Sequence, residues 1–384
     1  MDVTDWKATS VRQADADTLA RALRATRERT LGLIAAWQRA RPDLRVPRVA
    51  ELNPPLWELG HVGWFQEWWI ARNGQRALGT ACDPGHPREA SRLPGADALY
   101  NSSVVAHASR WDLPLPDLDA TRRYLELVLA DTLALLDGAG SDDDALYFWR
   151  LVLLHEDMHA EASVYMAQAL GVDLPPALRR GHPAVPAGAP TEVAVTAQRW
   201  RLGSDDAGFA FDNEQGATDV ALDAFHIDAA PVDWARYLPF VEATGHRLPP
   251  HLRRQDGQWQ ARRFGHWGPL DPGAPAVHLD WEDARAWCRW AGRRLPTEAE
   301  WECAALTAPE FGWGEVWEWT ASPFLPYPGF AAHPYRDYSA PWFGSRRVLR
   351  GACAATSAHL LCPRYRNYFP PERRDIFAGF RSAR

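Results

Sequence analysis

The chain has 384 residues, a length more typical of two domains than of one. Hydrophobic residues make up 46% of it, so a real core is expected, and a net charge of −7 argues against a nucleic-acid partner. No run approaches the ~20 apolar residues of a membrane-spanning helix, and the start lacks the apolar run of a signal peptide. The five cysteines are widely spaced and form no CxxC pair, which predicts a reduced, cytoplasmic protein. We expect a monomer that acts on small molecules and binds no membrane.

Four segments in the first half carry apolar residues at the spacing of a helix. They are residues 16–40, 54–74, 118–140 and 143–171. The last two begin near aspartates and end at glycines, which are common helix start and stop residues. Four such helices with a long second connection predict an all-α, up-and-down four-helix bundle.

A run rich in proline, glycine and alanine follows at 174–192 and predicts a linker. Beyond it the sequence changes to short strands, many turns and clustered aromatic residues, with helices expected at 232–244 and 281–306. The predicted division is a helical bundle, a linker and a loop-rich α+β domain, at residues 1–175, 176–192 and 193–384.

The string HEDMH at 155–159 matches the H-E-x-x-H motif of zinc proteases. Its two histidines lie one helical turn apart, so both imidazoles project from one face of an apolar helix. Two buried neighbouring histidines are costly unless they are hydrogen-bonded or bind a metal, and a satisfied pair of core histidines is the simpler alternative. The protease interpretation fails downstream, because Ala162 and Tyr165 stand where the extended motif requires glycine and histidine.

A third ligand is expected upstream, at His61 in the tryptophan-rich segment WELGHVGWFQEWW. Bundle cores commonly hold metal sites built from facing helices. Three neutral histidines leave coordination positions open, which suits a redox metal that holds O₂ and substrates, and zinc with a bound water also fits. Glu161 lies on another face from His159 and is expected either to orient a ligand imidazole or to be a solvated charge. Glu156 points away from the ligand face and is expected to be an ordinary helix residue.

These features, in this order, resemble the iron-dependent sulfoxide synthases of ergothioneine biosynthesis. Those enzymes join a DinB-like four-helix bundle to a formylglycine-generating-enzyme-like (sulfatase-modifying-factor) domain. The family's H-x-x-x-H-x-E iron motif matches His155, His159 and Glu161, and its upstream histidine matches His61. The second domain matches in GRRLPTEAEWE, VWEWTASPF, RVLRGAC and the ending IFAGFRSAR. The resemblance implies a mononuclear non-heme Fe(II) oxygenase that uses O₂ to attach sulfur or selenium to the imidazole C2 of hercynine.

The presumed donor-binding segment RNYFPPERRD departs from the R-N-W-D-Y-P-x-R-R pattern of relatives that use γ-glutamylcysteine. Asn367 and Arg373 persist, Tyr368 replaces the tryptophan, and Phe369 stands where the donor-binding aspartate would lie. A phenyl ring cannot pair with the ammonium group of an amino-acid donor. The resemblance therefore favours the selenoneine synthase branch, whose donor is a selenosugar. A thiol donor, cysteine or γ-glutamylcysteine, is the alternative.

Other substrate residues follow from the same resemblance. Met158 occupies the position of a glutamine that contacts hercynine, and Arg110 is the counterpart of a substrate-binding arginine. The catalytic tyrosine has no match, since Phe330 stands near its position in one branch. Four tyrosines are candidates: Tyr100, Tyr327, Tyr335 and Tyr338. A formylglycine-generating or non-catalytic peptide-binding protein is the alternative of another class, and Cys353 and Cys362 are the cysteines it would use.

Overall fold

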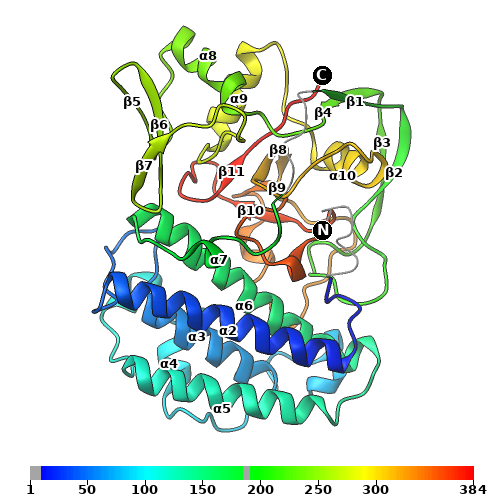
Figure 1. Cartoon of the computed structure of the whole chain (residues 1–384). Coiled ribbons are helices and arrows are strands. Elements are labelled where there is room, and N and C mark those ends of the chain that lie inside the picture. Colours follow the sequence, from blue (N-terminus) through cyan, green and yellow to red (C-terminus); the bar gives the residue numbers. More distant parts are fainter. Residues whose placement is uncertain (1–9, 185–190) are drawn as a thin grey trace.

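The computed structural model describes residues 10–184 and 191–384 and has two domains, a helical bundle and a loop-rich domain of short strands and helices (Figure 1). Four long helices form the bundle: α2 (Ala16–Ala40), α3 (Pro55–Trp69), α5 (Leu118–Leu136) and α6 (Asp143–Leu170). All four predicted helices are present. α3 ends five residues before the predicted limit, because the chain turns after Trp69 and Arg72 forms an ion pair with Asp97.

The ends of α6 show why the sequence forms this helix where it does. The side chain of Asp142 accepts a hydrogen bond from the amide of Ala145, which caps the N-terminus. Gly171 closes the C-terminus with a φ of 69°, a left-handed conformation that favours glycine. Between them, apolar residues on every side bury most of the helix.

The second connection of the bundle is ordered, and it contains three short helices: η2 (Arg76–Ala81), α4 (Ala96–Tyr100) and η3 (His107–Trp111). It packs tightly on α3 at Gly60. A Cβ atom on Gly60 would lie 2.2 Å from Cζ of Tyr100, so only glycine permits this approach. The close contact brings the backbone of Tyr100 to the side of α3 that carries His61.

The second domain is built from small sheets. The central one has the strand order β10-β9-β8-β11, in which β11 is parallel to β8 and the other pairs are antiparallel. Its strands are β8 (Trp317–Pro323), β9 (Arg347–Gly351), β10 (Asn367–Phe369) and β11 (Ala378–Gly379). A three-stranded hairpin sheet and two two-stranded sheets surround it. Their strands are β5 (Leu252–Gln255), β6 (Gln258–Arg263) and β7 (His266–Pro269), then β1 (Glu192–Val195) with β4 (Phe225–Asp228), and β2 (Gln198–Leu202) with β3 (Thr218–Leu222).

The helices of this domain correct one prediction. The segment 281–306, predicted as one helix, forms two helices with a break between them. Gly292 adopts a φ of 66° after the first, and Thr297 caps the second with its side chain. The longer helices are α8 (Trp234–Thr244), α9 (Trp281–Trp290) and α10 (Glu298–Thr307). The short ones are η4 (Ala340–Trp342) and η5 (Ala358–Leu360). The predicted linker 176–192 begins with the short helix α7 (Pro176–Arg179), and its residues 185–190 lie outside the described part of the chain.

The two domains share one continuous hydrophobic core, and α6 contributes much of the contact. The carboxylate of Asp157 on α6 accepts a hydrogen bond from Nδ1 of His359, 2.9 Å away in the second domain. Near the N-terminus, Arg12 and Glu214 form a buried ion pair between the domains.

The five cysteines are free and buried. Among the residues described, no helix is both long and apolar enough to cross a bilayer.

Candidate metal centre

Three histidines of the bundle converge on one point. His61 comes from α3, and His155 and His159 come from successive turns of α6. One ring nitrogen from each lies within 4.8 Å of the others, and this is the one such group of three potential ligands within the described residues. His61 and His155 are buried, while His159 is partly exposed. The three histidines that the sequence predicts as ligands therefore lie together in the structure. Their assignment as metal ligands stays a prediction.

Acceptors behind two of the rings set which nitrogen carries the proton. Nδ1 of His61 lies 2.8 Å from the carbonyl oxygen of Tyr100, and Nδ1 of His159 contacts the carboxylate of Glu58. Both oxygens can only accept, so in each neutral imidazole Nδ1 is protonated and Nε2 carries the lone pair. This is the form of histidine that binds a metal ion.

The geometry of the cluster fits a metal with nitrogen ligands. Nε2 of His155 and Nε2 of His159 lie 3.2 Å apart. Two ligands at about 2.1 Å from a metal, with an angle near 100° between them, give about the same separation. Nδ1 of His155 is buried without a hydrogen-bond partner among the described residues. Burial lowers the pKa of His155 well below its usual value and that of His61 to about 3, so both rings are neutral and available as ligands.

The carboxylate of Glu58 is the residue behind the cluster that the sequence interpretation missed. Besides His159, Glu58 contacts Asn53, whose side-chain amide donates to it at 2.5 Å. Arg110 in turn donates to Asn53 Oδ1 at 2.8 Å. Burial disfavours the charged form of Glu58, but the contact with His159 outweighs it and lowers the pKa to about 2. Glu58 lies three residues before His61 on one helix, which is the signal that could have identified it.

The structure places Glu161 away from the histidine rings. Its carboxylate accepts hydrogen bonds from Nε1 of Trp317 at 2.7 Å and from Oγ1 of Thr356 at 2.6 Å. Glu161 therefore connects α6 to the second domain, and the carboxylate that touches a candidate ligand is Glu58. Glu161 is not a solvated charge, because its carboxylate is buried, and its hydrogen bonds go to Trp317 and Thr356 and not to a ring of the cluster. Glu156 forms a buried ion pair with Arg27 at 2.8 Å, which agrees with a structural role.

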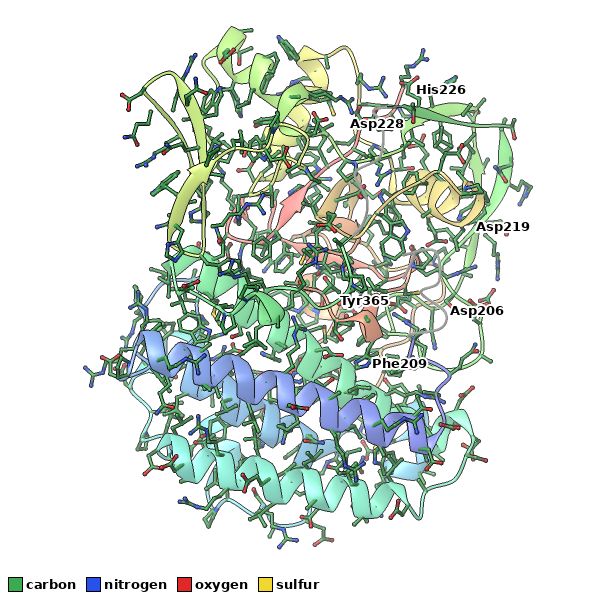
Figure 2. The ribbon with its side chains drawn as sticks, viewed as in Figure 1. Asp206, Phe209, Asp219, His226, Asp228 and Tyr365 are labelled. Carbon is green, nitrogen blue, oxygen red and sulfur yellow. The ribbon has the colours of Figure 1, made fainter. Side chains whose placement is uncertain are left out.

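Two of the predicted substrate residues lie beside the cluster. The guanidinium of Arg110 stacks over the ring of Trp57 at 3.9 Å, and Trp57 stacks on His61 with ring centroids 4.8 Å apart. Nε of Arg110 is buried without a partner among the described residues. Sδ of Met158 accepts a hydrogen bond from the hydroxyl of Tyr365 at 3.3 Å. Figure 2 labels Tyr365 near the junction of the two domains, where sequence reasoning did not place it.

The four candidate tyrosines separate by location. The ring of Tyr335 lies 6.2 Å from that of His155, so this tyrosine faces the cluster. Tyr338 follows three residues later, and its hydroxyl lies 3.1 Å from that of Tyr365. Tyr327 is buried in a cluster of charges in the second domain, bonded to Glu298. Tyr100 packs its side chain on α3 and offers its backbone to His61.

The predicted donor segment forms β10 and the turn after it. Oδ1 of Asn367 accepts from the amide of Tyr368 at 2.9 Å. The ring of Tyr368 stacks on Phe324 with centroids 4.0 Å apart, and its hydroxyl donates to the carbonyl of Tyr338. The guanidinium of Arg373 lies 5.2 Å from the ring centre of Phe369, so these two predicted residues do meet.

A carboxylate already neutralises Arg373. Asp375 accepts from its Nε at 2.5 Å and from its Nη2 at 3.0 Å.

The cysteines of the alternative interpretation lie in different surroundings, since Cys353 contacts Thr356 and Cys362 is close to the charge of Arg12. Burial raises the pKa of both thiols, which leaves them protonated.

The fold and the site define a two-domain protein whose helical bundle presents three histidines beside a domain of the formylglycine-generating-enzyme type. Residues 182–312 and 310–384 match the family model described as "Sulfatase-modifying factor enzyme 1-like domain". The chain is 33% identical to the "Hercynine oxygenase" of Mycolicibacterium thermoresistibile, over 95% of this chain and 94% of that protein. It belongs to the hercynine oxygenase family, of the ergothioneine sulfoxide synthase type.

Other relatives agree with this division. The "Hercynine oxygenase" of Mycobacterium tuberculosis is 32% identical, over 86% of this chain and 91% of its own length. The "Formylglycine-generating enzyme" of Streptomyces coelicolor is 30% identical, over 41% of this chain and 76% of its own length. The hercynine oxygenases therefore match nearly the whole chain, whereas the formylglycine-generating enzyme matches less than half of it.

Proposed function

We propose that this chain catalyses an O₂-dependent oxidation of hercynine that joins selenium or sulfur to C2 of its imidazole, with Fe(II) held by His61, His155 and His159. The observation that carries the proposal is the three-histidine cluster, with its lone pairs directed inward, in a chain of the hercynine oxygenase family. A bound ferrous ion would supply the redox chemistry and the site where O₂ and the two substrates meet.

The residues around the cluster suit a zwitterionic imidazole substrate. Arg110 has an unpartnered buried Nε, and we assign it the carboxylate of hercynine. Trp57 stacks on His61 and the ring of Tyr335 lies near that of His155, and aromatic faces attract quaternary ammonium groups. Tyr365 of the second domain donates a hydrogen bond to Met158, and we assign this pair to the substrate site as well. These groups bind and orient the substrate, and Tyr335 is the tyrosine best placed to hold a proton near the reacting carbon.

The selenosugar is the donor we favour, and Phe369 is the reason. No carboxylate stands at this position, and the nearby Asp375 already pairs with Arg373, so the ammonium group of an amino-acid donor lacks an ion-pair partner there. A sugar donor carries no ammonium group, so the missing carboxylate does not weaken its binding. The chain would then be a selenoneine synthase. The second candidate is ergothioneine sulfoxide synthesis with cysteine or γ-glutamylcysteine, which the names of the relatives favour.

One experiment tests the reaction and the donor together. The protein is reconstituted with Fe(II) without oxygen, mixed with hercynine, and offered a selenosugar, γ-glutamylcysteine or cysteine in separate reactions under air. Oxygen uptake and the mass of the product identify the donor. We expect the selenosugar to give the fastest turnover, and faster turnover with a thiol would transfer the assignment to the second candidate. Iron-loaded protein that turns over none of the three would refute the proposed function.

The ligand assignment needs its own variant. His61→Ala should abolish stoichiometric iron binding, because it removes one of three ligands. His246→Ala is the matched control, since His246 bonds to Asp283 in the second domain and has no contact with the cluster. Full iron occupancy in His61→Ala would show that this histidine is not a ligand.

A further inference from the structure

A cavity of about 470 Å³ lies where the C-terminal end of α6 meets the β5–β6 hairpin. Its volume is within the range of small-molecule sites, roughly 300–1,000 Å³. Its lining includes Gln168 from α6 and none of the three clustered histidines. Gln168 is nine residues past His159, which corresponds to about 14 Å along the helix. The cavity is therefore separate from the candidate metal centre.

Hydrogen bonds hold the walls of this cavity in place. Nε2 of Gln168 donates to the carbonyl of Arg262 at 2.8 Å, and Oε1 of Gln168 accepts from the amide of Phe264 at 2.7 Å. Arg262 lies in β6 and Phe264 in the turn that follows it, so one glutamine side chain fixes β6 against α6. The cavity is thus formed without a ligand, and binding requires little rearrangement.

Two histidines present polar atoms to this space. His278 is 4% exposed, and its Nδ1 has no hydrogen-bond partner among the described residues. Its ring packs edge-on against His251, with centroids 4.9 Å apart. Nδ1 of His251 accepts from Arg262 at 2.8 Å, so its Nε2 is left as a donor. Both residues have φ values in the left-handed region, 63° and 69°, which is uncommon outside glycine and costs energy that a binding role would justify.

Arginines give the cavity a positive balance. Four of them and two carboxylates line it: Arg179, Arg180, Arg262, Arg263, Asp271 and Glu315. Three of the arginines donate to acceptors, on Asp173, Glu315 and His251. Arg263 is exposed and has no acceptor within the part of the chain that the structure describes. Burial, followed by the charges of His251 and Arg263, lowers the pKa of His278 to about 3, so the positive charge at this end comes from the arginine.

We propose that this cavity binds a small organic anion with a flat apolar body. The apolar part would lie against aromatic side chains that line the cavity, which are Trp234, Phe264 and Phe377. The anionic head, a carboxylate or a phosphate, would lie beside Arg263 and accept a hydrogen bond from the Nε2–H of His251. The site does not depend on the proposed function, because none of its residues belongs to the metal centre.

Equilibrium dialysis with three matched probes tests this site: 2-naphthoate, 2-naphthyl phosphate and uncharged 2-naphthol. Arg263→Gln removes the unpaired charge, and Ala261→Trp fills the cavity from β6. Arg254→Gln is the control, because it removes an exposed arginine from the neighbouring strand of the same hairpin and does not line the cavity. Thermal unfolding of each variant shows whether the fold is intact. The exposed position of Arg263 keeps the test valid if Ala261→Trp does not fold.

We expect both anions to bind the native protein and Arg254→Gln saturably and more tightly than 2-naphthol. Arg263→Gln should weaken the binding of the anions about fivefold at low salt, and folded Ala261→Trp should abolish it. Tighter binding of the phosphate identifies the ligand as an organic phosphate, and tighter binding of naphthoate identifies it as a carboxylate. Equal affinity for the neutral probe, or unchanged anion binding in Arg263→Gln, would overturn the proposal.

Discussion

The contact between Glu58 and His159 offers the sharpest test of the candidate metal centre. We expect Glu58→Gln to weaken Fe(II) binding about tenfold and Glu58→Leu about a hundredfold, in keeping with the effect of losing a partner behind a metal ligand. These factors correspond to about 1.4 and 2.8 kcal/mol. Glutamine keeps an oxygen that can accept from Nδ1 of His159, whereas leucine leaves that buried N–H without an acceptor.

The larger effect of leucine also follows from the surroundings of Glu58. Asn53 donates to this carboxylate and itself accepts from Arg110, so leucine leaves the Asn53 amide without its acceptor. The ring of His159 then loses the contact that fixes its tautomer, and Nε2 no longer carries the lone pair in every molecule. Glutamine disturbs both contacts less, because its side chain keeps the shape of glutamate.

Anaerobic titration of Fe(II) against a competing chelator measures the affinity of each variant. Glu67→Gln is the matched control, because Glu67 is a buried carboxylate on the same helix that bonds to Tyr124 at 2.8 Å and to Ser91 at 2.6 Å. It should lower the melting temperature without changing the iron affinity. Iron binding by Glu58→Leu within twofold of the native protein, or equal weakening in Glu67→Gln, would refute the reasoning.

Three further substitutions have defined outcomes. Burial opposes the charge of Glu298, but the nearby Arg366 and Arg350 outweigh burial and lower the pKa of Glu298. The charged carboxylate therefore contributes its full stabilisation of the fold above pH 4.5, and this contribution is lost as the pH falls through the lower pKa of the folded state. Glu298→Gln should therefore cost about 3–5 kcal/mol at pH 7 in urea unfolding, and less under acid conditions. Tyr335→Phe should lower kcat at least about tenfold with iron affinity unchanged, and an unchanged kcat would remove it as a proton donor. Phe369→Asp should raise kcat/KM for cysteine or γ-glutamylcysteine about tenfold relative to the selenosugar, and an unchanged ratio would separate this position from donor choice.

The sequence predicts the parts of this protein that local spacing controls. Helix periodicity and the four-residue interval place His155 and His159 on one face of one helix, and the structure agrees. Contacts across the chain are a different matter. Tyr365 meets Met158 over a separation of 207 residues, and Glu161 meets Thr356 over 195. No pattern within a helix reports such pairs, because they depend on how the two domains pack.

Packing between the domains also explains why the unusual residues of this chain belong together. The hydroxyl of Tyr368, in the donor segment, donates to the backbone of Tyr338, and the hydroxyl of Tyr338 lies 3.1 Å from that of Tyr365. Tyr365 in turn donates to Met158, which precedes His159 on α6. A continuous row of contacts therefore joins the strand where the donor is expected to the helix that carries two candidate ligands. Since residues in contact do not act independently, we expect a substitution of Met158 and a substitution in the donor strand to have non-additive effects.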